Sequence, residues 1–142
     1  MHVIFNSMKE EIVFAAIENL KRVVPLNVAW KSLSNKGTDG KLELQMAGKK
    51  VMLHAIVMKE AADDQLSQIY RLAYKHPSFI VIAQKISPKI KVILRQIHQA
   101  YLEGDGDIFL FQKTVCLLID RHSETTNFTF DHTKTITTTK AI

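Results

Sequence analysis

Alternating apolar and polar residues predict a β-hairpin in the first half of the chain. In residues 41–47 leucine or methionine occupies every second position, and a second strand-like run covers residues 51–58. Because successive side chains of a strand point to opposite faces, the first run is expected to bury one face and expose the other. The intervening Gly-Lys-Lys at 48–50 is typical of a turn. We expect the rest of the fold to be organised around this hairpin.

Helical spacing of apolar residues predicts three helices. The first covers about residues 8–23, after a capping-box pattern of Ser7 and Glu10, and the second runs from about 63 to the His-Pro pair at 76–77. The third begins at Ser87 and Pro88 and is expected to reach Tyr101. Its predicted buried stripe is Ile90, Ile93, Leu94, Ile97 and Tyr101, and the stripe of the second helix is Leu66, Ile69, Tyr70 and Ala73.

Strands account for most of the remaining chain. Residues 27–33 are strand-like, and the continuous apolar run 79–83 is typical of a strand that is covered on both faces of a sheet. The Gly-Asp-Gly-Asp sequence at 104–107 predicts a turn, followed by a second hairpin over 108–111 and 115–119. The predicted order is α-β-β-β-α-β-α-β-β, an α/β fold with a mixed central sheet flanked by helices.

Length and composition predict one domain in residues 1–122 and a threonine-rich extension in 123–142. The extension is expected to be flexible, with disorder favoured from residue 133, although the alternating residues 127–130 also fit an edge strand. The single cysteine, Cys116, cannot form an internal disulfide, and no apolar stretch approaches the length of a bilayer span. We therefore expect a cytoplasmic protein with no membrane partner. The net charge of +5 is compatible with a nucleic-acid partner without requiring one.

The element order, together with Asp39 at the mouth of the first long strand, resembles the restriction-endonuclease-like fold, also called PD-(D/E)xK. More narrowly, the chain is similar to the N-terminal region of proteins labelled as type IV abortive-infection antitoxins. This likeness is carried by Thr-Asp-Gly-Lys-Leu-Glu-Leu at 38–44 and by segments 65–69, 79–83, 87–91 and 100–108. It covers about residues 8–120. The resemblance implies a DNA-related or regulatory role and a homodimer as a further expectation.

The chemistry that this resemblance implies requires an Asp on one strand and an acid-x-Lys triplet on the next, so that two carboxylates hold a divalent cation. The expected triplet is Ile56-Val57-Met58, in which neither end can bind Mg²⁺ or carry charge. An active site would need Asp39 as metal ligand and relocated groups. The vestigial candidates are Asp39, Lys59, Glu60 and Gln65, and Glu11 is a possible additional acid. Without the resemblance, Asp39 and the following glycine fit an ordinary turn before a strand.

Basic residues on the second and third helices, with the nearby Lys85, are the candidates for nucleic-acid binding, although a solvated helix face is the favoured explanation of the same residues. They are Lys85, Lys89, Lys91, Arg95, Arg71 and Lys75. The leading hypothesis is a catalytically degenerate nuclease-like domain acting in nucleic-acid binding or antitoxin-like regulation, with no cofactor. The alternatives are a Mg²⁺-dependent nuclease with relocated residues and a protein-interaction module.

Overall fold

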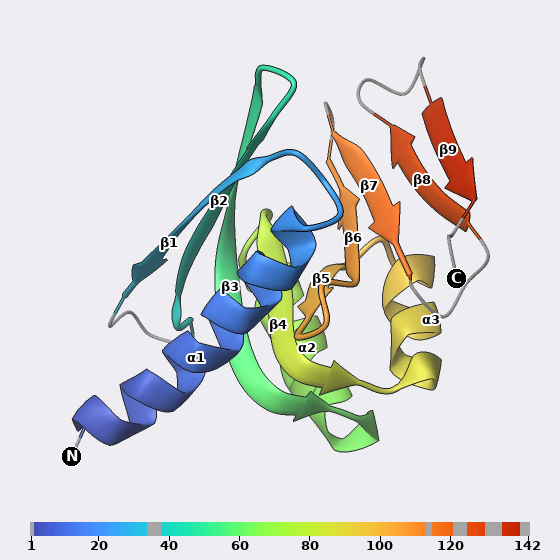
Figure 1. The fold of residues 1–142 in the computed structure, drawn as a ribbon. Coiled ribbons are helices and arrows are strands. Elements are labelled where there is room, and N and C mark those ends of the chain that lie inside the picture. The colour runs from blue at the N-terminus through green and yellow to red at the C-terminus, as the bar shows by residue number, and fades with distance from the viewer. Residues whose placement is uncertain (1, 34–37, 113–114, 121–124, 130–134, 140–142) are drawn as a thin grey trace.

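The computed structural model describes residues 2–33, 38–112, 115–120, 125–129 and 135–139 (Figure 1). The predictions for the 34–37 loop, for residues 113–114 of the second hairpin, and for residues 121–124, 130–134 and 140–142 lie outside these ranges. In chain order the elements are α1 (His2–Lys21), β1 (Asn27–Ser32), β2 (Gly40–Met46), β3 (Lys49–Ala61), the 3-10 helix η1 (Asp63–Gln65), α2 (Leu66–Lys75), β4 (Phe79–Ile86), α3 (Pro88–Gln96), β5 (Ala100–Glu103), β6 (Ile108–Phe111), β7 (Cys116–Ile119), β8 (Thr125–Thr129) and β9 (Thr135–Thr139).

The described strands form one mixed sheet in the order of the sequence, β1 to β9. The pairs β1–β2 and β2–β3 are antiparallel, β3–β4 and β4–β5 are parallel, and every later pair is antiparallel. Each parallel pair needs a crossover, which α2 and α3 supply. The carboxyl ends of β3, β4 and β5 therefore meet at one edge of the sheet.

Helices cover both faces of the central strands (Figure 1). Val13, Ala16 and Leu20 of α1 belong to one core cluster, which also contains the buried Ile80 and Ile82 of β4. The other cluster packs α2 and α3 against the opposite face and contains the intervening residues of that strand. The apolar run at 79–83 is thus buried on both sides, as its lack of alternation predicts. The prediction of a mixed central sheet flanked by helices is confirmed.

The boundaries of two helices differ from the predicted ones. The first helix begins at His2, so Ser7 lies inside it and not at a cap. The third helix ends at Gln96, and Tyr101 lies on the fully buried strand β5, which the sequence did not predict. His98, with a φ of 58°, turns the chain between them. Ile97 is therefore exposed instead of contributing to a buried stripe.

Residues beyond 122 contribute two strands in the described segments. β8 pairs with β7, and β9 pairs with β8, so the sheet continues past the expected domain boundary. The division at residue 122 remains a prediction. In the described part of the chain, none of the helices combines the length and apolar character needed to span a bilayer.

Candidate functional site

Asp39 lies immediately before β2 and joins that strand to α1 and β3. Its Oδ1 is 2.7 Å from the Nζ of Lys9 on α1, and its Oδ2 accepts a 2.7 Å hydrogen bond from the backbone N–H of Val57. Its own N–H donates to the carbonyl of Ala55. Because both carboxylate oxygens have partners on other elements, this side chain acts as a clamp between helix and sheet. A cation bound here would have to displace the lysine.

The carboxylate of Asp39 contacts Lys9 on α1 and the Val57 N–H, whereas strict alternation with Lys41 would place it on the polar face of the hairpin. The strand begins only at Gly40, so Asp39 does not follow its alternation and its side chain reaches α1 instead. The residue beside the carboxylate is Val57, whereas Ile56 packs in the core cluster beneath α2 and α3. The triplet to compare with acid-x-Lys is therefore Val57-Met58-Lys59. Valine stands where the resemblance would require the acid, and a lysine is present at the third position.

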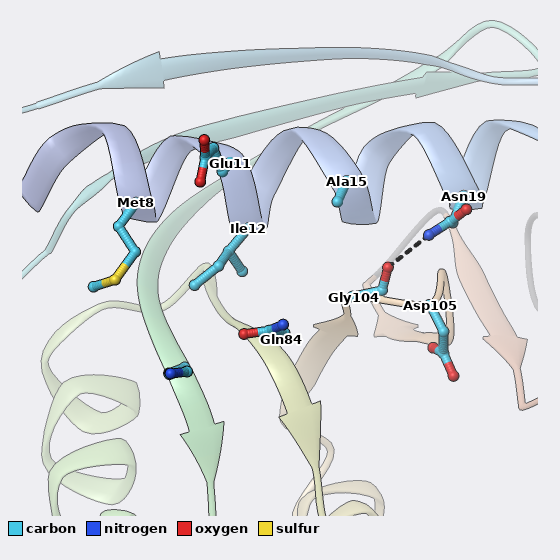
Figure 2. A pocket seen from close by; sticks show the side chains of 9 residues that line it. Met8, Glu11, Ile12, Ala15, Asn19, Gln84, Gly104 and Asp105 are labelled. Carbon is cyan, nitrogen blue, oxygen red and sulfur yellow. Dashed lines mark hydrogen bonds between the residues drawn. The ribbon is translucent and has the colours of Figure 1, made fainter. Parts of the chain in front are cut away.

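A cleft opens at the carboxyl ends of β3, β4 and β5, where α/β sheets commonly bind ligands. It consists of two cavities of about 460 and 800 Å³, which share Lys59, Gln84 and Asp105. Figure 2 shows the smaller cavity between α1 and the sheet, where the side-chain amide of Asn19 donates a 2.8 Å hydrogen bond to the carbonyl of Gly104. The remaining lining residues are Met8, Glu11, Ile12 and Ala15 in the smaller cavity and Glu60, Lys85 and Glu103 in the larger one.

The cleft brings together some of the predicted site residues but does not complete a metal site around Asp39. Lys59 and Glu60 both line the larger cavity. Gln65 ends the 3-10 helix before α2 and does not line either cavity. Among the residues that the structure describes, the acids that gather as a group of three are Glu103, Asp105 and Asp107, without Asp39.

A buried lysine pairs with two members of that acidic group. Lys91 on α3 forms ion pairs with Glu103 and, at 2.9 Å, with Asp107. Burial alone would lower the pKa of the Lys91 ammonium, but its hydrogen bonds to Glu103 and Asp107 and their negative charges outweigh burial and raise the pKa. The other oxygen of Glu103 accepts from the N–H of Ile86 at 2.6 Å. The ammonium of Lys91 thus supplies the positive charge that balances these carboxylates. The network also holds the predicted 104–107 turn against α3.

Burial removes Lys91 from the predicted basic surface of α3, because its side chain is only 4% exposed. Arg95 donates to the hydroxyl of Tyr101 at 2.6 Å and lies 3.7 Å from Asp120. Lys89 is exposed but pairs with Asp63 at 3.3 Å. The helix α3 therefore does not present a row of unpaired cations. Lys85 lines the larger cavity described above.

The helix α2 carries an exposed aromatic and basic face that the sequence interpretation missed. Arg71 and Lys75 are exposed, as predicted for nucleic-acid contacts, and Tyr70 and Tyr74 lie beside them. Tyr70 was expected in the buried stripe but is 44% exposed. The available signal was the four-residue spacing of the two tyrosines, which matches that of the two cations.

Two histidines meet where β3 begins to pair with β4. The ring centroids of His54 and His76 are 4.8 Å apart, and His76 also stacks near Phe79. Burial lowers the pKa of His54, and the charges of His76 and Lys41 lower it further. His54 is thus a packed histidine at the start of the parallel strand pair.

Comparison with known proteins does not identify a family. No family model matches the chain, and no curated protein or solved structure matches it. The restriction-endonuclease-like resemblance therefore stays a prediction, and a proposed role has to be argued from the geometry.

Proposed function

We propose that the chain is a catalytically degenerate nuclease-like domain that binds nucleic acid, in the manner of an antitoxin-like regulator. The absence of catalysis is supported by Asp39, because both oxygens of its carboxylate are already engaged, one by Lys9 and the other by the Val57 N–H. The element order from α1 to β4, with three antiparallel strands followed by a helix and a parallel strand, supports the nuclease-like architecture.

Metal-dependent hydrolysis would need a second carboxylate next to Asp39. The neighbouring strand position is Val57, which is buried and has no oxygen to offer a hard cation. Lys9 already neutralises the carboxylate and competes with any incoming cation. Retention of Lys59 without the acid leaves a residue that can attract phosphate but cannot help to hold a metal.

Binding of a polyanion is supported by the net charge and by cations that the fold leaves exposed. Arg71, Lys75 and Lys85 are all exposed, and no described salt bridge engages them. The cleft itself is less favourable to a polyanion, because Glu11, Glu60 and Asp105 accompany its lysines. The favoured contact surface therefore includes α2.

Fluorescence anisotropy with labelled single-stranded and duplex DNA at several salt concentrations tests the proposal. Affinity should fall linearly on a log–log plot against salt, and Arg71→Met with Lys75→Met should reduce the slope. Lys49→Met, an exposed change at the β2–β3 turn, is the matched control and should leave the slope unchanged. Absent or salt-independent binding would refute nucleic-acid binding.

A cleavage assay separately tests the proposal that the domain does not cleave nucleic acid. Plasmid and single-stranded DNA incubated with Mg²⁺ or Mn²⁺ should remain intact. Cleavage that disappears in Asp39→Ala would establish the nuclease alternative instead.

A protein-interaction module is the second candidate function, and exposed aromatic side chains favour it. Tyr74 is 95% exposed and Phe111 is 42% exposed, and aromatic side chains are enriched where proteins contact one another. This role predicts a stable partner that remains bound after nuclease treatment.

A further inference from the structure

The solvent face of α2 combines two aromatic rings with two cations. The exposed residues of this helix are Ser67, Tyr70, Arg71, Tyr74 and Lys75, while Ile69 and Leu72 anchor it to the sheet. No acidic residue lies within α2 itself. We call Tyr70, Arg71, Tyr74 and Lys75 the α2 face.

The tyrosines of the α2 face are not explained by packing. Tyr74 is 95% exposed, so its ring gains almost nothing from burial, and Tyr70 keeps 44% of its surface in contact with solvent. Residues four apart on a helix are neighbours on one side of it. The two rings therefore project from the same side of α2, about one turn apart.

Charge on the α2 face favours an anionic ligand. Arg71 and Lys75 each follow a tyrosine by one residue and share the same four-residue spacing. Within the described residues, no salt bridge neutralises either cation. Aromatic rings interleaved with cations form the usual platform for single-stranded nucleic acid, in which bases stack on rings and phosphates contact the cations.

The spacing of the rings distinguishes a single strand from a duplex. Four residues advance about 6 Å along a helix axis, whereas stacked bases in B-DNA advance about 3.4 Å per strand. Adjacent bases in a duplex cannot reach both rings without unstacking. An unpaired strand can extend to do so.

We propose that the α2 face binds single-stranded nucleic acid, with Tyr70 and Tyr74 stacking on bases and Arg71 and Lys75 contacting phosphates. This inference rests on the proposed function and adds the class of nucleic acid and the surface that recognises it. Its occupant is sequence-tolerant, because every base offers a face for stacking.

The test compares binding of fluorescein-labelled dT15 and a 15-base-pair duplex to the full chain and to single variants. Tyr74→Ala should weaken dT15 binding roughly 5- to 150-fold, the range for loss of one stacked base. Tyr74→Phe should retain binding, because the ring is kept. Phe14→Ala removes an aromatic side chain that is 54% exposed on α1, at the opposite face of the sheet, and should have no effect.

Salt dependence separates the two kinds of contact. Tyr74→Ala should lower affinity at every salt concentration without changing the slope, whereas Lys75→Met should reduce the slope by about 0.7, the value for one phosphate of a single strand. Because both side chains are exposed, neither change should alter the far-ultraviolet circular dichroism spectrum.

Failure of this inference is distinguishable from failure of the proposed function. If the wild-type chain binds dT15 or duplex and Tyr74→Ala binds equally well, the α2 face is not the contact surface, although nucleic-acid binding stands. If the wild-type chain binds neither probe, both proposals fail. A protein partner that is lost in Tyr74→Ala, in a chain that does not bind dT15, would assign the α2 face to protein docking and overturn the inference.

Discussion

Removal of the Lys91 ammonium should destabilise the fold strongly, since it would leave two buried carboxylates without their counter-ion. The side chains of Lys91, Glu103 and Asp107 are 4%, 8% and 0% exposed, so water cannot solvate the two carboxylates that remain. Breaking a buried ion pair from one side typically costs about 3–5 kcal/mol. We expect Lys91→Met to lower the free energy of unfolding by about that amount. Urea unfolding followed by circular dichroism at pH 7 measures it.

Two further variants make this result decisive. Lys89→Met removes an ion pair on the same helix, but Lys89 and Asp63 are 70% and 68% exposed, so the loss should stay below about 0.5 kcal/mol. Adding Glu103→Gln and Asp107→Asn to Lys91→Met removes the uncompensated charges and should recover part of the stability. A Lys91→Met loss below about 1 kcal/mol, or a triple variant no more stable than the single one, would refute the explanation by buried charge.

Three other perturbations have defined outcomes. Asp39→Ala should lower the free energy of unfolding by about 1–3 kcal/mol in urea titrations, because it leaves the buried Val57 N–H without its acceptor; an unchanged midpoint would contradict the clamp. Gly40→Ala should destabilise the fold and lower the melting temperature, because a Cβ would lie 2.5 Å from the carbonyl oxygen of Lys31. In Gly48→Ala the added Cβ meets no atom within 4 Å, so a loss of stability in that variant reports the strain of its φ of 79° and not a clash. Because the pKa of His54 is lowered in the folded chain, the unfolded chain binds a proton more readily at this residue. The free energy of unfolding should therefore fall as pH decreases below about 6.5, and His54→Gln should make it less dependent on pH. Equal pH profiles of the variant and the wild type would exclude His54 as the source of the pH dependence.

The elements predicted best from the sequence are those fixed by local patterns. The short run at 79–83 has no alternation, as expected of a strand covered on both faces, and it forms such a strand. Ser87 caps α3 as predicted by accepting a hydrogen bond from the Ile90 N–H. By contrast, β5 was hidden because Ile97 and Tyr101 continue the spacing of the preceding helix. A left-handed residue at His98 breaks that helix, and no glycine marks the break.

The candidate site depended on contacts between distant residues, which periodicity does not encode. Alternation gave the correct opposite faces for Val57 and Met58 but could not say which face the carboxylate of Asp39 would reach. Lys91 was assigned to the surface because lysines are rarely buried without partners. Its partners are Glu103 at the end of β5 and Asp107 in the following turn, whose position against α3 follows only once β5 is known.

The double engagement of Asp39 also limits how this chain could acquire hydrolytic activity. Introducing Glu at position 57 would supply the acid of the triplet ahead of Lys59, but Lys9 would still hold the carboxylate that the cation needs. Removal of Lys9 alone would free that oxygen while leaving valine at the neighbouring position. Each change by itself costs stability and creates no metal site. A route to catalysis by single substitutions therefore passes through less stable, inactive intermediates, so the clamp at Asp39 opposes the gain of cleavage activity.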